Sequence, residues 1–214
     1  MDEKMEIKYI LPSDIEKESF RIIKEELSEM GKVIPENLMP TVVRVIHTTA
    51  DFEYADTMTF SENAIDIAKA AIREGAHIVT DTNMALSGIS RKTLEKYGGQ
   101  VHCFMSDEDV AREAKERQVT RAYVSMERAC KIDAPLIFAI GNAPTALISL
   151  HELMKENPAN KPRLIIGVPV GFVNVVEAKE LIMDSDVPYI INRGRKGGSG
   201  VAAAICNSIL YNME

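Results

Sequence analysis

Cysteine is scarce in this chain of 214 residues. Cys103, Cys130 and Cys206 are odd in number and lie far apart in the sequence. Residues spaced in this way form neither a disulfide framework nor the paired ligands of a zinc site. Their scarcity is typical of a reduced, cytoplasmic protein, and we expect it to hold no metal.

Long apolar runs and positive charge are also in short supply. No apolar run approaches the roughly 18 residues that a membrane span needs. The N-terminal Met-Asp-Glu-Lys-Met does not begin a signal peptide. The net charge is -7, so neither nucleic acid nor a membrane is an expected partner. A small anionic ligand fits this chain only where arginines and lysines gather locally.

Several catalytic motifs are missing as well. The chain has no G-x-S-x-G elbow, no P-loop and no cysteine–histidine–asparagine set. His151-Glu152 lacks the second histidine that a zinc protease motif requires, so we expect it on a helix surface. His77 and His102 fall in expected strands and are interpreted as structural.

Helical periodicity dominates the first third of the chain. Apolar residues at helical spacing predict helices over about 12–31, 37–49 and 61–75. Pro40 fits the first turn of the second helix, and Ser61 is the expected N-cap of the third. The first helix is expected to bury an apolar stripe formed by Ile15, Phe20, Ile22, Ile23 and Leu27.

From residue 76 onward, short apolar runs alternate with helical patterns. Strands are expected at 76–80, 100–105, 135–140, 163–166 and 187–192. A turn is expected at Gly88, and helices at about 90–98, 107–116, 120–131 and 200–211. This alternation favours a parallel sheet with helices on both faces. We therefore expect a single three-layer α/β/α domain with a mostly parallel sheet of about five strands, in which 1–75 is a helical part and 76–214 the α/β core.

Three of the expected strands run into glycine-rich turns that open helices. Gly141, Gly167 and Gly194 lie about 26 residues apart, one strand–turn–helix unit each. In an open parallel sheet such turns line up at the carboxyl ends of the strands, where ligands bind. Free amides at helix N-termini attract anions. The residues alone thus indicate an α/β protein that binds a small anion at one composite site.

The last turn imitates a dinucleotide-binding loop. Gly198-Ser-Gly-Val-Ala-Ala203 matches G-x-G-x-x-A between a strand and a helix. Only eleven residues follow Ala203, too few for the second strand and acidic residue that would hold a ribose. Two interpretations stay open: a cap that lets a helix pack tightly on a strand, or a phosphate or carboxylate cradle charged by Arg193, Arg195 and Lys196.

His47 is the strongest candidate for acid–base chemistry, because histidine titrates near neutral pH. Arg44 at i-3 and Asp51 at i+4 would share its face if the helix continues. A helical histidine is more often solvated or packed than catalytic. Ser19 and Arg121, taken alone, are likewise expected to be exposed helical residues.

Five segments of the chain form a recognisable set. Two of them are very specific, Gly141-Asn-Ala-Pro-Thr-Ala-Leu147 and Gly167-Val-Pro-Val-Gly-Phe-Val173. The others are Glu18-Ser-Phe-Arg-Ile-Ile23, Arg44-Val-Ile-His47 and Arg193-Gly-Arg-Lys-Gly-Gly-Ser199. In order and spacing, from about residue 9 to the C-terminus, the set resembles the precorrin-8X methylmutase family of corrinoid biosynthesis, including its cobalt-precorrin-8 form.

The resemblance implies an isomerase that moves a methyl group from carbon 11 to carbon 12 of (cobalt-)precorrin-8, giving hydrogenobyrinate or cobyrinate. A shift within one molecule needs no redox cofactor and no metal of the protein's own, so we expect no cofactor. It needs a large, flat pocket and one positioned proton donor. Family members are homodimers with the pocket at or near the subunit interface. The implied partners are therefore a second copy and a corrinoid tetrapyrrole.

Carried over position by position, the resemblance makes His47 the acid that protonates the ring C region of the macrocycle. Ser19, Arg44 and Arg121 fall on substrate-contacting positions. The residues after the histidine vary among relatives, which leaves the role of Asp51 open. The substrate-binding set is completed by residues of the three turns: Gly141, Asn142, Ala143, Gly167, Pro169, Gly171, Arg193, Arg195 and Gly197.

The implied substrate is rimmed with acetate and propionate groups, which an acidic protein binds only through local arginines. We therefore expect Arg44, Arg121, Arg193 and Arg195 to converge on one pocket. Two other functions stay open. One is a non-catalytic tetrapyrrole carrier that uses the same turns, and the other is a nucleotide-dependent α/β enzyme that uses the turn at Gly198.

Overall fold

A six-stranded sheet forms the centre of the molecule. The structure is a computed structural model that describes residues 9 and 11–213. The strand order is β1-β6-β5-β4-β2-β3, with β1 antiparallel to its neighbour and all other pairs parallel. In chain order the strands are β1 (Met58–Phe60), β2 (His77–Thr80), β3 (Val101–His102), β4 (Leu136–Ile140), β5 (Leu164–Gly167) and β6 (Tyr189–Asn192).

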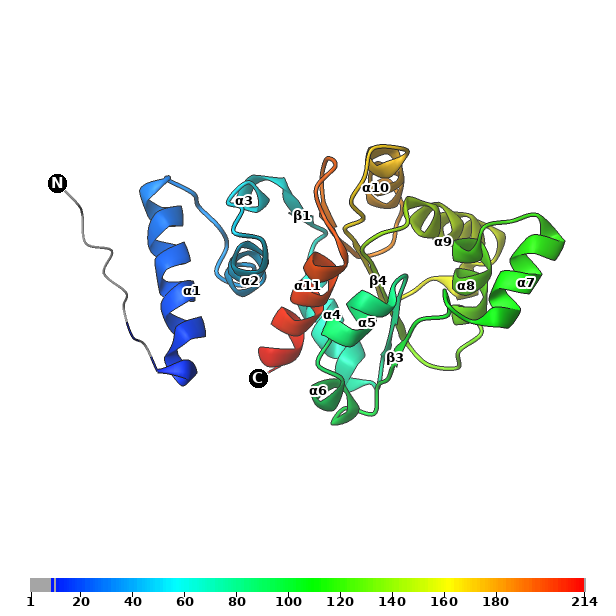
Figure 1. Ribbon diagram of the computed structural model, residues 1–214, viewed down its shortest axis with the longest axis horizontal. Coiled ribbons are helices and arrows are strands. Elements are labelled where there is room, and N and C mark those ends of the chain that lie inside the picture. Colours follow the sequence, from blue (N-terminus) through cyan, green and yellow to red (C-terminus); the bar gives the residue numbers. More distant parts are fainter. Residues whose placement is uncertain (1–8, 10, 214) are drawn as a thin grey trace.

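Helices cover both faces of this sheet (Figure 1). All residues of β4 and β5 are buried, as is typical of parallel strands enclosed on both sides. The predicted α/β/α class and the mostly parallel sheet are therefore confirmed.

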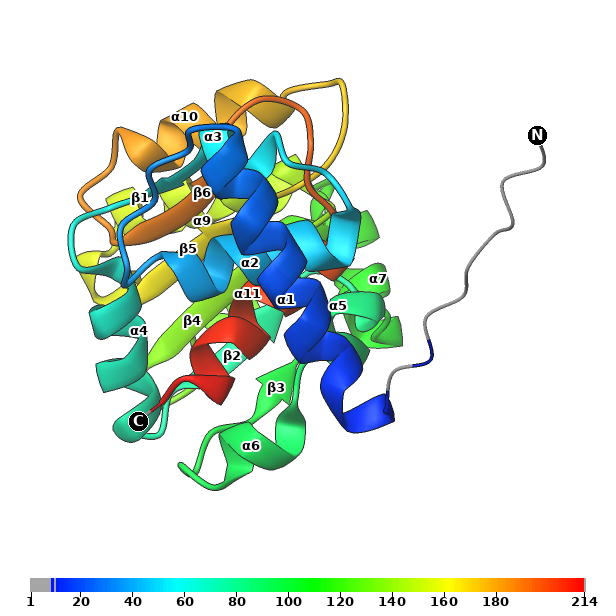
Figure 2. The ribbon, with the colours of Figure 1, turned by 90° about the vertical axis from the view of Figure 1, so that its left-hand side faces the viewer.

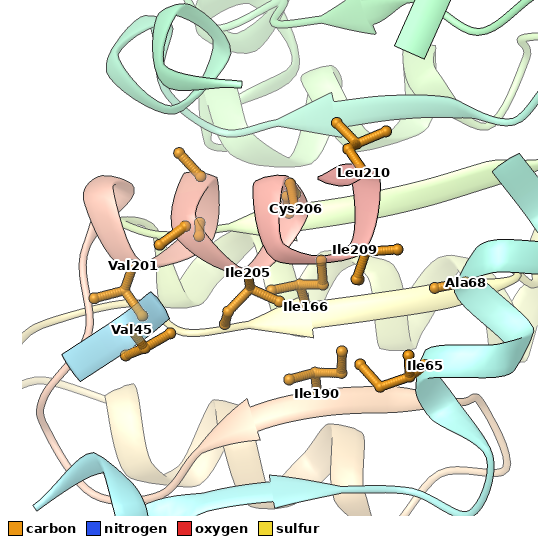
Figure 3. Packing of buried hydrophobic residues seen from close by; sticks show 14 of the residues in the cluster. Val45, Ile65, Ala68, Ile166, Ile190, Val201, Ile205, Cys206, Ile209 and Leu210 are labelled. Atoms are coloured by element: carbon orange, nitrogen blue, oxygen red, sulfur yellow. The ribbon is translucent and has the colours of Figure 1, made fainter. Parts of the chain in front are cut away.

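One face is covered by helices from both ends of the chain. The C-terminal helix α11 (Ser199–Tyr211) packs against the sheet and against α2 (Met39–Thr49), and α4 (Ala64–Arg73) lies beside it. Ile205 of α11 lies beside Ile166 of the sheet, and Ile65 of α4 lies beside Ile190 (Figure 3). Full burial of one such side chain contributes roughly 1.5–3 kcal/mol.

The helix α1 (Pro12–Glu29) forms an outer layer that lies across α2 (Figure 2). It buries Ile23 and Leu27, as the predicted stripe requires. Ile15 and Ile22 of that stripe are instead 53% and 41% exposed. The stripe was predicted too wide, because an outermost helix packs along one narrow side only.

The other face is covered by α8 (Arg121–Ala129), α9 (Pro144–Glu156) and α10 (Val175–Met183). Outside them, α7 (Glu108–Arg117) packs against α8. The helices predicted near 107–116, 120–131 and 200–211 are confirmed to within two residues. The remaining short elements are α3 (Tyr54–Thr57), α5 (Asn83–Gly88), α6 (Arg91–Glu95) and the 3-10 turn η1 (Pro158–Asn160).

The sheet has one strand more than predicted, because β1 lies in the part that was expected to be helical. Its three residues are too few for a recognisable alternation, and β1 exists through its pairing with β6. Ser61 belongs to this pairing and was wrongly predicted as a helix cap. Its hydroxyl accepts a hydrogen bond from the Tyr189 N–H at 2.9 Å, and α4 starts after Asn63 instead.

Two further predictions around β2 need correction. The strand expected at 100–105 is only two residues long, because β3 is an edge strand that pairs with β2 alone. Where only a turn at Gly88 was expected, the chain forms α5. Its N-cap is Thr82, whose hydroxyl accepts from the Ala85 N–H at 3.1 Å.

Two histidines face each other across β2 and β3. His77 Nδ1 lies 2.9 Å from His102 Nε2, and the two rings are stacked with centroids 5.0 Å apart. Burial lowers the pKa of His102, and the nearby His77 lowers it further. The hydrogen bond requires one of the two nitrogens to be unprotonated, so both rings cannot be charged while it persists.

We expect this pair to weaken the fold in acid. Because the folded pKa of His102 lies below its unfolded value of about 6.5, its contribution to stability is present above that pH and is lost as the pH falls through the folded pKa. Between about pH 7.5 and about pH 5.5, the melting temperature of His102→Gln should therefore fall less than that of wild type. An equal fall in both proteins would contradict this expectation.

Candidate active site

The three glycine-rich turns meet at one edge of the sheet, as predicted. They follow β4, β5 and β6, which are parallel, so their carboxyl ends point the same way. The turns also hydrogen-bond to one another. The Gly198 N–H donates to the Val168 carbonyl at 2.8 Å, and the Gly171 N–H donates to the Arg195 carbonyl at 3.2 Å. The composite edge is thus one interlocked unit.

The first turn holds an anion that belongs to the chain itself. The backbone N–H groups of Gly141, Asn142 and Ala143 donate to the Asp81 carboxylate at 2.9, 2.8 and 2.6 Å. Asp81 is only 1% exposed. Burial raises its pKa, while the three backbone hydrogen bonds lower it. These amides, predicted to face substrate, are therefore occupied, and the exposed Asn142 side chain is what this turn presents to solvent.

Close packing explains the glycines of the other two turns. A Cβ atom on Gly197 would lie 2.1 Å from the Val168 carbonyl oxygen and 2.9 Å from the carbonyl oxygen of buried Pro169. Gly167 is the last residue of β5, where a Cβ would meet the side chain of Ile191. The last turn is therefore packed tightly against the second turn at Gly197, whereas a Cβ atom on Gly198 would meet nothing within 4 Å.

A buried lysine supports the last turn from below. Lys179 of α10 is fully buried, and its Nζ donates to the carbonyls of Gly194 and Lys196 at 2.8 and 2.9 Å. Burial lowers its pKa to about 8. Sequence reasoning missed Lys179. The available signal was its place on the apolar face of the helix, four residues after Val175 and three before Ile182.

His47 lies at the other side of the site, in the last turn of α2. Its Nδ1 is 2.7 Å from the Ser19 hydroxyl of α1, and the Phe20 ring meets the imidazole edge-on with centroids 5.3 Å apart. The His47 side chain is exposed. The structure thus pairs two of the predicted residues, and leaves Nε2 as the free ring nitrogen.

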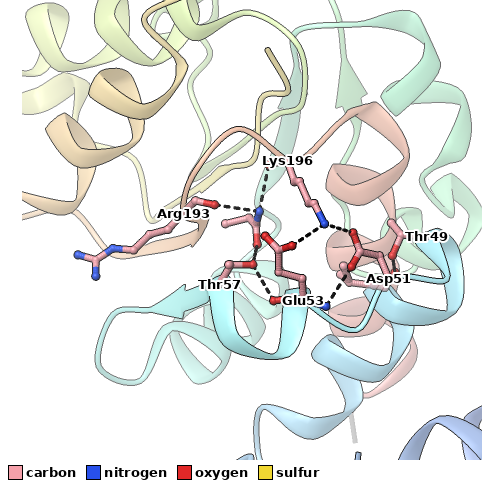
Figure 4. Close-up of polar contacts among 8 residues, drawn as sticks. Thr49, Asp51, Glu53, Thr57, Arg193 and Lys196 are labelled. Atoms are coloured by element: carbon pink, nitrogen blue, oxygen red, sulfur yellow. Dashed lines mark hydrogen bonds and ion pairs between the residues drawn. The ribbon is translucent and has the colours of Figure 1, made fainter. Parts of the chain in front are cut away.

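The end of α2 adjoins the turns. The Thr48 methyl group would be 3.8 Å from a Cβ atom on Gly200 at the start of α11. Lys196 of the last turn reaches over to Asp51 and Glu53, at 2.5 and 2.7 Å (Figure 4). These pairs lower the pKa of Asp51 and raise that of Lys196. His47 therefore borders the glycine-rich edge.

Asp51 does not share the face of His47, because the helix does not continue as far as Asp51. The helix ends at Thr49 because Ala50 adopts a left-handed conformation, with φ of 51°. The chain then turns away, and the Asp51 carboxylate pairs with Lys196 rather than with the imidazole.

The four arginines expected to converge come from three places in the fold: α2, the last turn and the start of α8. Arg44 is held between the rings of Phe20 and Tyr211, at 5.0 and 4.9 Å, and pairs with Glu16. Figure 4 shows the Arg193 side chain pointing away from the Lys196 cluster. Arg121 is exposed at the start of α8, in the layer across the sheet from α2.

A cavity of about 380 Å3 opens beside Arg44 between α1, α2 and the end of α11. Lys24 and Phe20 line it, and the Phe20 ring also contacts His47. The cavity and the imidazole thus share Phe20 as a neighbour, and the charged groups at the cavity wall are Lys24, Arg44 and its partner Glu16.

The second turn exposes apolar side chains near the last turn. Val170, Phe172 and Val173 are 47%, 82% and 76% exposed. The Arg195 guanidinium lies 5.4 Å from the centre of the Phe172 ring. An exposed apolar patch rimmed by charge is typical of a binding surface.

The described part of the chain offers neither a metal-binding cluster nor a helix suited to cross a membrane. Residues 9 and 11–213 contain no group of three or more histidine, cysteine, aspartate or glutamate side chains placed to hold a metal ion. Within the same residues, no helix has the length and apolar character that crossing a membrane requires.

Known proteins resemble this chain over nearly all of its length. A family model described as precorrin-8X methylmutase matches residues 14–212. A cobalt-precorrin-8 methylmutase of Priestia megaterium is 46% identical over 200 residues, covering 94% of this chain and 88% of the relative. The Salmonella typhimurium protein of the same name is 39% identical over 210 residues, covering 95% and 96%.

Solved structures agree with this likeness. A precorrin-8X methylmutase from Thermus thermophilus superposes with a TM-score of 0.83 at 35% identity, covering 94% of this chain and 97% of that one. A second structure, described as a precorrin-8X methylmutase related protein, gives a TM-score of 0.79 at 29% identity and covers 90% and 99%.

Replacing Asp81 by asparagine tests the internal anion. The amide keeps the size of the side chain but turns an N–H donor toward backbone N–H groups. We expect the free energy of unfolding in urea to fall by about 2–4 kcal/mol. Asp133→Asn, at an exposed carboxylate before β4, is the matched control and should stay within about 0.5 kcal/mol of wild type. Equal stability of the two variants would contradict this role.

Proposed function

The chain belongs to the precorrin-8X methylmutase family, and we propose that it catalyses the family's methyl shift with His47 as the general acid. It is an isomerase of the vitamin B12 pathway. The substrate we propose is (cobalt-)precorrin-8, whose methyl group moves from carbon 11 to carbon 12. The observation that carries the catalytic assignment is the 2.7 Å contact between Ser19 and His47, which leaves Nε2 of an exposed imidazole free.

Ser19 suits both states of such an acid. In the charged imidazolium, the Nδ1–H donates to the Ser19 hydroxyl oxygen and the Nε2–H faces solvent. When Nε2 gives its proton to ring C of the macrocycle, the neutral ring keeps its Nδ1–H and the same hydrogen bond. No rearrangement is needed during proton transfer, because the same hydrogen bond holds the ring in both states.

The reaction balances within one molecule. Protonation withdraws electrons from the ring system, the bond between the methyl group and carbon 11 breaks, and a bond to carbon 12 forms. The product then loses one proton, which His47 Nε2 takes back. Substrate and product are isomers, so the residues needed are one acid that is also the base and a pocket that holds the macrocycle still.

For the pocket, we propose the surface between His47 and the glycine-rich edge. The apolar side chains at 170–173 suit the flat face of a tetrapyrrole. Arg195 is exposed beside them and suits a carboxylate group at its rim. At the opposite wall, Arg44 and Lys24 add positive charge beside the imidazole.

We also propose a cytoplasmic homodimer in which a second copy completes the pocket. The cavity beside Arg44, about 380 Å3, is small for a macrocycle, since pockets for ordinary small ligands span roughly 300–1,000 Å3. Arg121 lies in the layer across the sheet from His47, so a second copy is a simple way to bring an arginine of that kind to the site. The second copy would then cover the apolar side chains at 170–173, which are exposed in a single chain.

The catalytic proposal is tested by His47→Ala. We expect kcat to fall by about a hundredfold to ten-thousandfold while the substrate still binds. Ser19→Ala removes the partner of Nδ1 and should cause a smaller loss, of about tenfold. The measurement is the visible spectrum of the corrinoid during turnover, together with a binding titration.

His151→Ala is the matched control, because that histidine lies on α9 across the sheet from α2. It should retain wild-type turnover. Tight binding without any spectral change in wild type would instead support the alternative of a non-catalytic tetrapyrrole carrier. Undiminished turnover in His47→Ala would exclude His47 as the acid.

A further inference from the structure

Lys179 is a buried cation without an anionic partner. Its side chain is fully buried in the layer between α10 and the sheet, and burial alone lowers its pKa. The ion pairs formed by residues 9 and 11–213 do not include it. Burying a charge in this way is costly unless hydrogen bonds compensate for the lost contact with water.

Both hydrogen bonds of the Lys179 Nζ go to one short loop, residues 193–197. They reach the carbonyls of Gly194 and Lys196 at 2.8 and 2.9 Å. The buried Asn192 side chain donates to the Lys196 carbonyl as well, at 3.0 Å. Gly194 has a φ of 74°, a left-handed conformation that glycine adopts without strain. The buried side of the loop is thus fixed by hydrogen-bond donors from Lys179 and Asn192.

The outer side of the same loop places the Arg195 guanidinium 5.4 Å from the centre of the exposed Phe172 ring, whereas Arg193 pairs with Glu180 of α10 at 3.5 Å. The side chains of Arg193 and Arg195 are exposed. The Lys196 side chain crosses to Asp51 and Glu53, in the segment directly after the helix that carries His47 (Figure 4). One loop therefore connects the buried ammonium group to the two parts of the proposed site.

We propose that Lys179 is a positioning residue, which fixes the loop 193–197 so that Arg195 faces the anionic rim of the substrate and Lys196 reaches the segment after His47. This role rests on the proposed function. An apolar side chain of equal length would fill the same space but leave two carbonyls without a donor. Lys179 itself touches no part of the proposed pocket, so it acts through the loop.

The test compares Lys179→Met with Lys161→Met, the removal of an exposed lysine. The first readout is independent of catalysis. Trypsin cleaves after arginine and lysine, so the bonds following Arg193, Arg195 and Lys196 report whether the loop is held. In the folded protein we expect cleavage at these bonds to be at least about tenfold faster in Lys179→Met than in wild type or the control.

The second readout is the split between KM and kcat. A misplaced loop weakens binding, so KM of Lys179→Met should rise by about tenfold or more while kcat falls by less. A purely structural role would lower the amount of folded enzyme and leave KM unchanged. Lys179→Gln, which keeps two N–H donors on a shorter side chain, should recover part of the loss in both readouts.

Wild-type cleavage rates and wild-type KM in Lys179→Met would overturn the proposal. So would the failure of both Lys179 variants to fold, because the lysine would then serve the core rather than the loop. If wild type itself does not convert the corrinoid, the proposed function fails, and the trypsin readout alone still decides whether Lys179 holds the loop.

Discussion

Buried backbone groups need hydrogen-bond partners, and the glycine-rich edge meets this need with side-chain charges. Beyond the ends of the strands, the sheet no longer supplies partners for the amides and carbonyls of the turns. Asp81 accepts from three amides of the first turn, and Lys179 donates to two carbonyls of the last. Two internal charges of opposite sign therefore hold the surface on which the proposed pocket is built. The amides of the first turn do bind an anion, and that anion is the chain's own Asp81 carboxylate.

Much of this arrangement could be predicted from the sequence. Strands β4, β5 and β6 read as apolar runs because both of their faces are buried, and their turns had to share an edge once the sheet was parallel. The strand β1 could not be read, because its three residues depend on pairing with β6. Ser61 likewise has the residue type of a helix cap, and only the neighbouring strand shows that it bonds Tyr189 instead. Tertiary pairing decided both cases.

The candidate site, too, could be predicted only in part from the sequence. His47 stood out as a titratable residue on a helix, whereas its contact with Ser19 depends on how α1 crosses α2. Asp51 does not join His47, because one left-handed residue, Ala50, ends the helix before it. Lys179 was overlooked because a lysine on an apolar helical face gives no hint of the carbonyls above it. The expected convergence of arginines came from the charge of the ligand, and one chain alone does not display it.

Two parts of the molecule form the proposed site: the helices α1 and α2, which carry His47 as the acid, and the glycine-rich edge of the sheet, which lines the pocket. The central claim is that one macrocycle lies between them with its ring C at the imidazole. A crystal structure with the corrin product bound tests this most directly. We predict His47 Nε2 within about 3.2 Å of a ring C atom, with Arg195 on a carboxylate at the rim. A product bound with no contact to His47 would contradict the account.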